Sequence, residues 1–63
     1  MSYNEKRELD ALPERIDALE KEIASIEQEL VSGKIYVSER LAPAQAELEI
    51  AVERWAELAE RAQ

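Results

Sequence analysis

The most regular feature of the chain is the spacing of its apolar residues, which recur every three or four positions in two separate blocks. Such spacing places the apolar side chains on one side of an α-helix and, sustained over three heptads, is typical of a coiled coil. The first block consists of Leu9, Leu12, Ile16, Leu19, Ile23, Ile26 and Leu30, and the second of Val37, Leu41, Ala44, Leu48, Ala51, Trp55, Leu58 and Ala62.

The two blocks are separated by a short segment that contains the chain's one glycine, Gly33. Glycine commonly ends a helix because it adopts the left-handed conformation without steric cost. A connection of only a few residues makes two successive helices fold back antiparallel. We therefore predict an all-α fold, a two-helix antiparallel intramolecular coiled-coil hairpin, in which residues 1–63 form one domain.

Two prolines set the expected boundaries of the helices. Pro13 lies inside the first block, where its ring would remove a helical hydrogen bond, so we expect it to open the long helix. Residues 1–12 then form a short helical segment kinked against a first long helix over residues 13–32. Residues 33–37 form the hairpin tip, and a second long helix spans residues 38–62. Ser38 is the expected cap of that helix, which starts in a distorted turn there or at Pro43.

The heptads also predict a register, because each layer of an antiparallel pair combines one a and one d position. The expected layers are Ile26 with Leu41, Ile23 with Ala44, Leu19 with Leu48, Ile16 with Ala51, Leu12 with Trp55, and Leu9 with Leu58. We expect a monomer, since the second stripe is rich in alanine, and a dimer of two chains as a four-helix bundle is the alternative.

Composition restricts the chemistry that the chain can perform. Its 63 residues include no Cys and no His, so disulfides, common zinc sites and the usual catalytic bases and thiol nucleophiles are excluded. We expect no enzymatic activity, cofactor or metal. No apolar run approaches the roughly 20 residues of a membrane span, and the N-terminus has no hydrophobic signal core. We expect no membrane partner and a cytoplasmic location.

Two aromatic residues have alternative interpretations. Trp55 is expected in the core opposite Leu12, although an exposed indole could stack on a base. Val52 and Ala59 widen the apolar stripe beside it, and either the segment before Pro13, including Tyr3, packs there or a partner docks on it.

The expected tip places Tyr36 between Lys34 and Arg40. Tyr36 either closes the hairpin end over Leu30 and Val37, or contacts a nucleotide or a partner together with the two basic residues.

The net charge of −7 does not favour nucleic-acid binding, so such binding would require a local basic cluster. Arg15, Arg54 and Arg61 share one edge of the predicted coil, with Arg15 facing Arg54, and Lys6 and Arg7 lie near the same end. One hypothesis is a phosphate clamp. The alternative is that nearby carboxylates neutralise the arginines, namely those of Glu8, Glu22, Glu47 and Glu57.

The sequence also resembles a known family, the C-terminal coiled-coil domain of Uup-type ABC-F ATPases. The resemblance covers nearly the whole chain and depends on the elements Ser2-Tyr3, Arg7-Glu8-Leu9, Leu12-Pro13, Leu48-Glu49, Arg54-Trp55 and Glu57-Leu58, with Tyr36 at the tip. It implies an accessory domain attached to the ATP-binding cassettes of a cytoplasmic ATPase that acts on ribosomes or DNA. In that case Arg7 and Arg54 match positions that could contact nucleic acid, and the ATPase residues lie outside this chain.

Two other functions remain open at this point. The acidic surface favours a protein-interaction or spacer arm without a nucleic-acid role. The helical hairpin is also similar to the C-terminal arm of valyl-type tRNA synthetases, which steadies tRNA.

Overall fold

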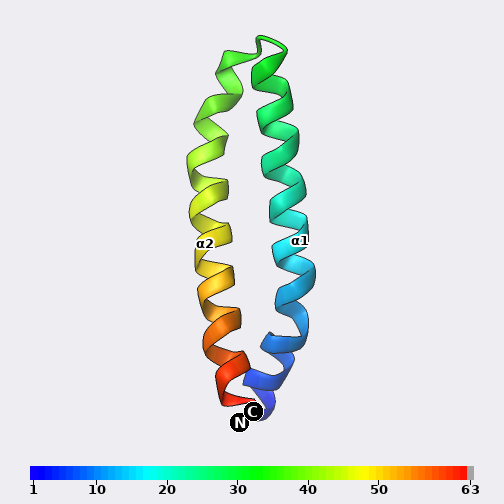
Figure 1. The fold of residues 1–63 in the computed structure, drawn as a ribbon, viewed down its shortest axis with the longest axis vertical. Coiled ribbons are helices and arrows are strands. Elements are labelled where there is room, and N and C mark those ends of the chain that lie inside the picture. The colour runs from blue at the N-terminus through cyan, green and yellow to red at the C-terminus, as the bar shows by residue number, and fades with distance from the viewer. Residues whose placement is uncertain (63) are drawn as a thin grey trace.

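The computed structural model describes residues 1–62 and contains two long helices that lie side by side and antiparallel (Figure 1). Helix α1 spans Tyr3–Val31, a 3-10 turn, η1, spans Ile35–Val37, and helix α2 spans Ser38–Arg61. They form a rod of 46 × 16 × 15 Å, with the N-terminus and the end of α2 together at one end and η1 at the other. The predicted all-α antiparallel hairpin is confirmed.

The first long helix, expected from residue 13, begins instead at Tyr3, because its N-terminus is capped there. The side-chain oxygen of Ser2 accepts a hydrogen bond from the Glu5 backbone N–H at 3.2 Å, and the Glu5 carboxylate accepts from the Ser2 backbone N–H at 3.4 Å. This reciprocal capping box satisfies backbone donors that a helix start leaves unpaired. The cap sets the first turn at Tyr3, ten residues before Pro13.

The helix does not break at Pro13, so the separate segment expected over residues 1–12 is instead the first part of α1. Proline removes one backbone hydrogen bond in the helix interior. Leu9 and Ile16, one turn before and after Pro13, both pack against the core, and this packing offsets that loss. Figure 1 shows α1 bending towards α2 in its N-terminal part, as proline-containing helices commonly do.

Gly33 ends α1 with a φ of +97°, in the left-handed region predicted for it. The Lys34 backbone N–H donates to the Glu29 carbonyl at 3.0 Å, and the Gly33 N–H donates to the Leu30 carbonyl at 3.0 Å. These two bonds form the Schellman motif, which satisfies carbonyls at the end of a helix. The motif turns the chain directly into η1 and back along α1.

Helix α2 starts at Ser38 rather than at Pro43. Val37 occupies the N-cap position, and no side chain makes a cap hydrogen bond there, so Ser38 is the first helical residue and not the predicted cap. Val37 is instead part of the core, with 3% of its surface exposed. Its burial at the tip fixes the start of α2.

The core consists of two clusters along the seam between the helices. One contains Leu12, Leu19, Ala51 and Leu58, with Leu9, Ile16 and Leu48 packed against it. The other contains Ile23, Ile26, Val37 and Ala44, with Leu30, Leu41 and Leu48 packed against it. In five of the six predicted layers, both residues belong to the same cluster, which agrees with the predicted register.

The sixth layer, Leu12 with Trp55, was predicted wrongly. Leu12 is buried, but Trp55 is 41% exposed and belongs to neither core cluster. Ala51 and Leu58 already surround Leu12 in this part of the seam. The bulky indole therefore lies at the edge of the seam and not within it.

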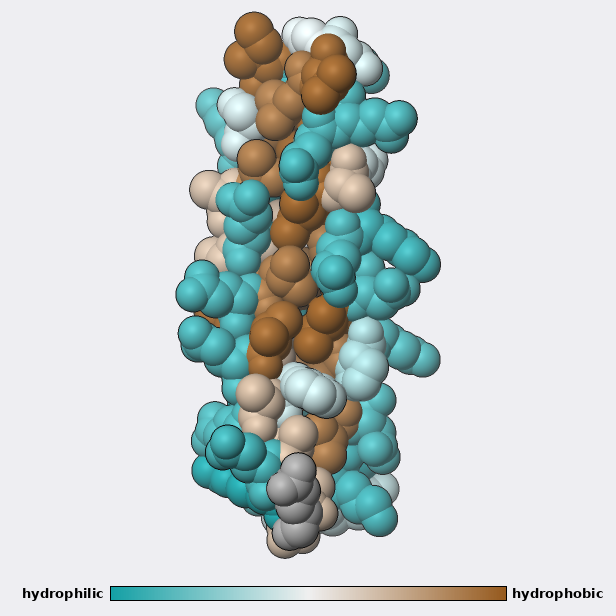
Figure 2. Space-filling model, in the orientation of Figure 1, coloured by the Kyte–Doolittle hydropathy of each residue, from teal (hydrophilic) through white to brown (hydrophobic). Residues whose placement is uncertain are grey.

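The two sets of heptad positions are buried unequally. Leu12, Leu19, Ala51 and Leu58 are buried, whereas among the alternate positions Ile23 is buried and Leu9, Ile16, Leu30, Leu41 and Leu48 are only partly covered. Figure 2 shows an apolar stripe along the seam, bordered by polar edges, on the face in view. We call the partly covered positions, together with Val52 and Trp55, the open face.

Candidate nucleic-acid interface

Four ion pairs connect the helices along one flank of the seam, and we call them the ion-pair ladder. They are Glu5–Arg61 at 2.6 Å, Glu8–Arg54 at 2.7 Å, Arg15–Glu47 at 3.4 Å and Glu22–Arg40 at 3.8 Å. The α2 members recur every seven residues, which keeps them on one edge of that helix. The ladder therefore follows the seam towards the tip from the end where α1 begins and α2 ends, which we call the open end.

The Glu8–Arg54 pair has the best geometry in the ladder. Arg54 donates from Nε to one oxygen of Glu8 at 2.7 Å and from Nη2 to the other at 3.1 Å, a bidentate arrangement that favours both charged forms. The hydrogen bonds from Arg54 lower the pKa of Glu8, and those to Glu8 raise the pKa of Arg54. Hydrogen bonding from Arg61, and then from Ser2, lowers the pKa of Glu5.

These contacts bear on the two hypotheses for the arginine edge. Arg15 and Arg54 do not face each other, because each pairs with a glutamate of the opposite helix. Arg61 pairs with Glu5 and Glu57, and Arg54 also approaches Glu57 at 3.4 Å. Glu8, Glu47 and Glu57 thus lie against these arginines, as the alternative hypothesis stated, whereas Glu22 pairs with Arg40 instead. These contacts favour that alternative over the phosphate clamp.

A shallow groove lies beneath the ladder, between the Glu8–Arg54 and Arg15–Glu47 pairs. It has a volume of about 360 Å³, and Ala11, Leu12, Ile50 and Ala51 contribute apolar walls. Within residues 1–62 no group of acidic side chains is placed to hold a metal ion.

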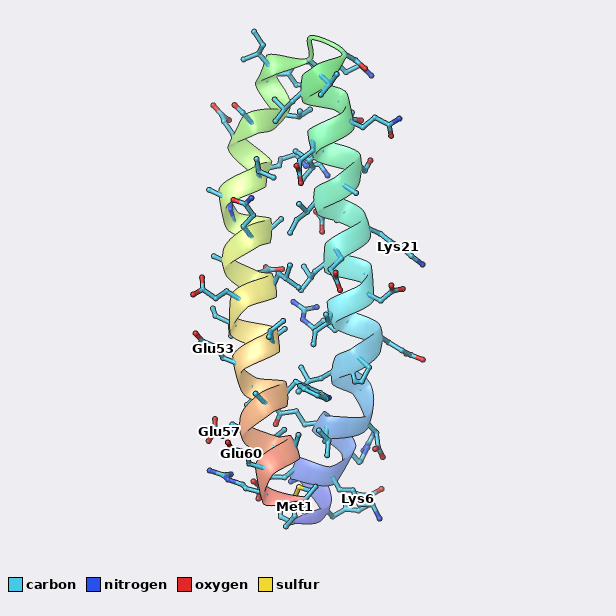
Figure 3. The ribbon with its side chains drawn as sticks, viewed as in Figure 1. Met1, Lys6, Lys21, Glu53, Glu57 and Glu60 are labelled. Atoms are coloured by element: carbon cyan, nitrogen blue, oxygen red, sulfur yellow. The ribbon has the colours of Figure 1, made fainter. Side chains whose placement is uncertain are left out.

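Lys6 and Arg7 remain available at the open end of the rod. Within residues 1–62 neither forms an ion pair with a carboxylate. The Arg7 guanidinium lies over the Tyr3 ring, 5.9 Å from its centre, which is within range of a cation–π interaction. Tyr3 is 73% exposed, which does not favour the alternative in which it packs beside Trp55. Figure 3 shows Lys6 at this end, beside Met1.

The predicted tip residues do not form one cluster. Tyr36 is 74% exposed and does not close the hairpin, a role that Val37 fills. Arg40 is drawn back along the rod towards Glu22, whereas Lys34 makes no ion pair with the described part of the chain. The sequence did not indicate that Val31 and Ile35, 90% and 74% exposed, would make the tip apolar.

The ladder predicts a pH dependence of stability. Because the pKa of Glu8 is lowered on folding, its ion pair stabilises the fold above the ordinary glutamate pKa of about 4.3. This stabilisation is lost as the pH falls towards the lowered value. The melting temperature of wild type should exceed that of Glu8→Gln at pH 7, and the difference should shrink as the pH is lowered below the ordinary glutamate pKa.

The matched control is Glu53→Gln, since Glu53 is exposed and points away from α1 (Figure 3). It should leave the melting temperature nearly unchanged at pH 7. An equal loss in both variants at pH 7 would show that the ion pair contributes nothing specific.

The chain also matches a known protein family. The model described as the ABC transporter C-terminal domain matches residues 1–60, nearly the whole chain. This match agrees with the resemblance found in the sequence and favours it over the tRNA synthetase arm. No curated protein and no solved structure shows a significant match. Neither helix, over the described residues, is long and apolar enough to span a membrane.

Proposed function

Since the chain belongs to the ABC transporter C-terminal domain family, we propose that it is an accessory domain through which a parent ATPase engages DNA or ribosomal RNA. The observation that carries the proposal is the group formed by Lys6, Arg7 and exposed Tyr3 at the open end of the rod. The group combines the two chemistries that bind nucleic acids without sequence preference, namely cations for phosphates and an aromatic ring for bases.

The position of this group supports the proposal despite the net charge of −7. The arginines on the ladder are already compensated by glutamates, so they add little positive potential. At the open end, by contrast, Lys6 and Arg7 are adjacent in α1, and the two glutamates that flank them, Glu5 and Glu8, are already paired with arginines of α2. Binding there would be weak, because it would involve few phosphate contacts, and its affinity would fall as salt is added, because those contacts are electrostatic.

The test is a titration of labelled duplex DNA, single-stranded DNA and structured RNA with the chain at low salt, followed by anisotropy. The double variant Lys6→Ala/Arg7→Ala should weaken binding and reduce the slope of log K against log salt by about two, roughly one for each phosphate contact. The control Lys21→Ala/Arg40→Ala changes the net charge equally, away from the open end.

The control should lower affinity only slightly, because Lys21 pairs with Asp17 and Arg40 with Glu22. Equal losses in the two double variants would indicate a general charge effect and contradict a site at the open end. If no nucleic acid binds even at low salt, the proposal is wrong.

A second function, a protein-interaction or spacer arm, is favoured by the tip. Val31, Ile35 and Tyr36 are exposed at the end of the rod farthest from the open end (Figure 1). Clustered exposed apolar side chains commonly mark protein contacts. Under this function the chain binds no nucleic acid, and substitution of Ile35 and Tyr36 by serine removes a protein contact of the parent ATPase.

A further inference from the structure

The two flanks of the seam are built differently, which leaves one side of the hairpin uncovered. On the first flank, the ladder crosses from helix to helix at four levels. On the opposite flank, the positions that face one another in the same register are Pro13 and Val52, Glu20 and Gln45, and Glu27 and Ser38. Within residues 1–62 none of these combinations is an ion pair.

The open face lies on this uncovered flank. Val52 and Trp55 are 44% and 41% exposed, and Leu9, Ile16 and Leu48 beside them are only partly buried. Figure 2 shows the apolar stripe extending over much of the rod's length. In a coiled coil a further helix with apolar residues at heptad spacing can pack into such a stripe.

The edges of the open face indicate which kind of helix fits it. On α1, Glu20 and Glu27 follow Ile16 and Ile23 by four residues and therefore border the stripe. Asp10 lies one step farther out on the same side of α1, as does Asp17, which pairs with Lys21. The α2 edge of the open face carries Ser38, Gln45 and Ala59, and its one charged residue is Glu49. The four arginines of the ion-pair ladder lie on the opposite flank of the seam.

We propose that the open face docks a basic amphipathic helix of a partner protein, completing a three-helix bundle. Its apolar stripe would cover Trp55, Val52 and Leu48, and its Lys or Arg residues would face Glu20 and Glu27. Charge favours a basic helix over a second copy of the chain as the occupant, since two chains of net charge −7 repel one another. The apolar contact would supply affinity, and the charges would select the partner and speed its association.

Trp55 provides a direct measurement because it is the only tryptophan in the chain. The probe is a synthetic 21-residue helix with leucines at heptad a and d positions, lysines flanking them and no tryptophan. Binding should shift the Trp55 emission to shorter wavelength, because the half-exposed indole would leave water. A peptide with the same leucines and glutamates in place of the lysines should bind at least tenfold more weakly.

Two single variants locate the binding surface. Val52→Glu places a charge on the open face and should reduce the peptide's affinity at least tenfold. The matched control Ile50→Glu adds the same charge on the ladder side of α2, where Ile50 is 66% exposed, and should change affinity less than threefold. Circular dichroism of both variants shows whether the hairpin stays folded.

The charge specificity is tested by Glu20→Lys/Glu27→Lys, which should reverse the preference between the two peptides. The absence of an emission shift, equal binding of both peptides, or equal losses in Val52→Glu and Ile50→Glu would each overturn the proposal. So would sedimentation showing that wild type forms dimers which Val52→Glu dissociates, because the occupant would then be a second copy.

Discussion

Leu58→Ala is expected to lower the free energy of unfolding by about 2–5 kcal/mol, the range measured when large buried aliphatic side chains are truncated. Leu58 has 0% of its surface exposed and packs with Leu12 and Leu19 across the seam. A helix pair cannot collapse easily around the missing atoms, because each helix is held by layers on both sides. Small domains are stabilised by only about 5–15 kcal/mol, so much of the stability would be lost.

The unfolding free energies of wild type and Leu58→Ala are measured by chemical denaturation at 25 °C, with circular dichroism as the signal. The control is Ile50→Ala, which removes a similar side chain from a 66% exposed position and should stay within about 0.5 kcal/mol of wild type. If Leu58→Ala behaved like the control, Leu58 could not lie in the seam in solution.

Ala51→Leu should also destabilise the chain, by about 1–3 kcal/mol, although it adds apolar surface. Ala51 is 5% exposed and lies in the same cluster as Leu12, Leu19 and Leu58. A small residue at this level allows the two helices to approach closely, and a leucine would force them apart or into strained rotamers.

The control for this substitution is Ala46→Leu, on the exposed outer side of α2. Alanine and leucine have similar helix propensities, so Ala46→Leu should leave the unfolding free energy nearly unchanged. A stabilising effect of Ala51→Leu would mean that the seam is more loosely packed than the structure indicates.

The heptad spacing was sufficient to predict the hairpin, the turn at Gly33 and five of the six layers, because apolar burial at that spacing admits few arrangements. It could not place Trp55, since spacing records that a residue is apolar but not whether an indole fits beside Ala51 and Leu58. The prediction that the long helix begins at Pro13 was wrong, because it considered the hydrogen bond that proline removes but not the Ser2 cap or the packing of Leu9 and Ile16.

The candidate site was less predictable than the fold. Sequence positions put Arg15 and Arg54 on the correct edge, but which charge faces each of them depends on the relation between two helices. In the structure Arg54 pairs with Glu8 rather than facing Arg15. The group of Tyr3, Lys6 and Arg7 lies in the helical segment predicted before Pro13, but the spacing alone did not predict that the Arg7 guanidinium lies over the Tyr3 ring.

Because the heptad register is constant along the rod, the length of the rod can be changed in fixed steps. Removing seven residues from α1 and the seven opposite them from α2 deletes two complete layers and leaves the remaining layers, the capped end and the glycine turn in the same relation. Each such step shortens the hairpin by about 10 Å, at about 1.5 Å per helical residue. The distance between what binds at the tip and what binds at the open end can therefore be varied in fixed increments without redesigning either end.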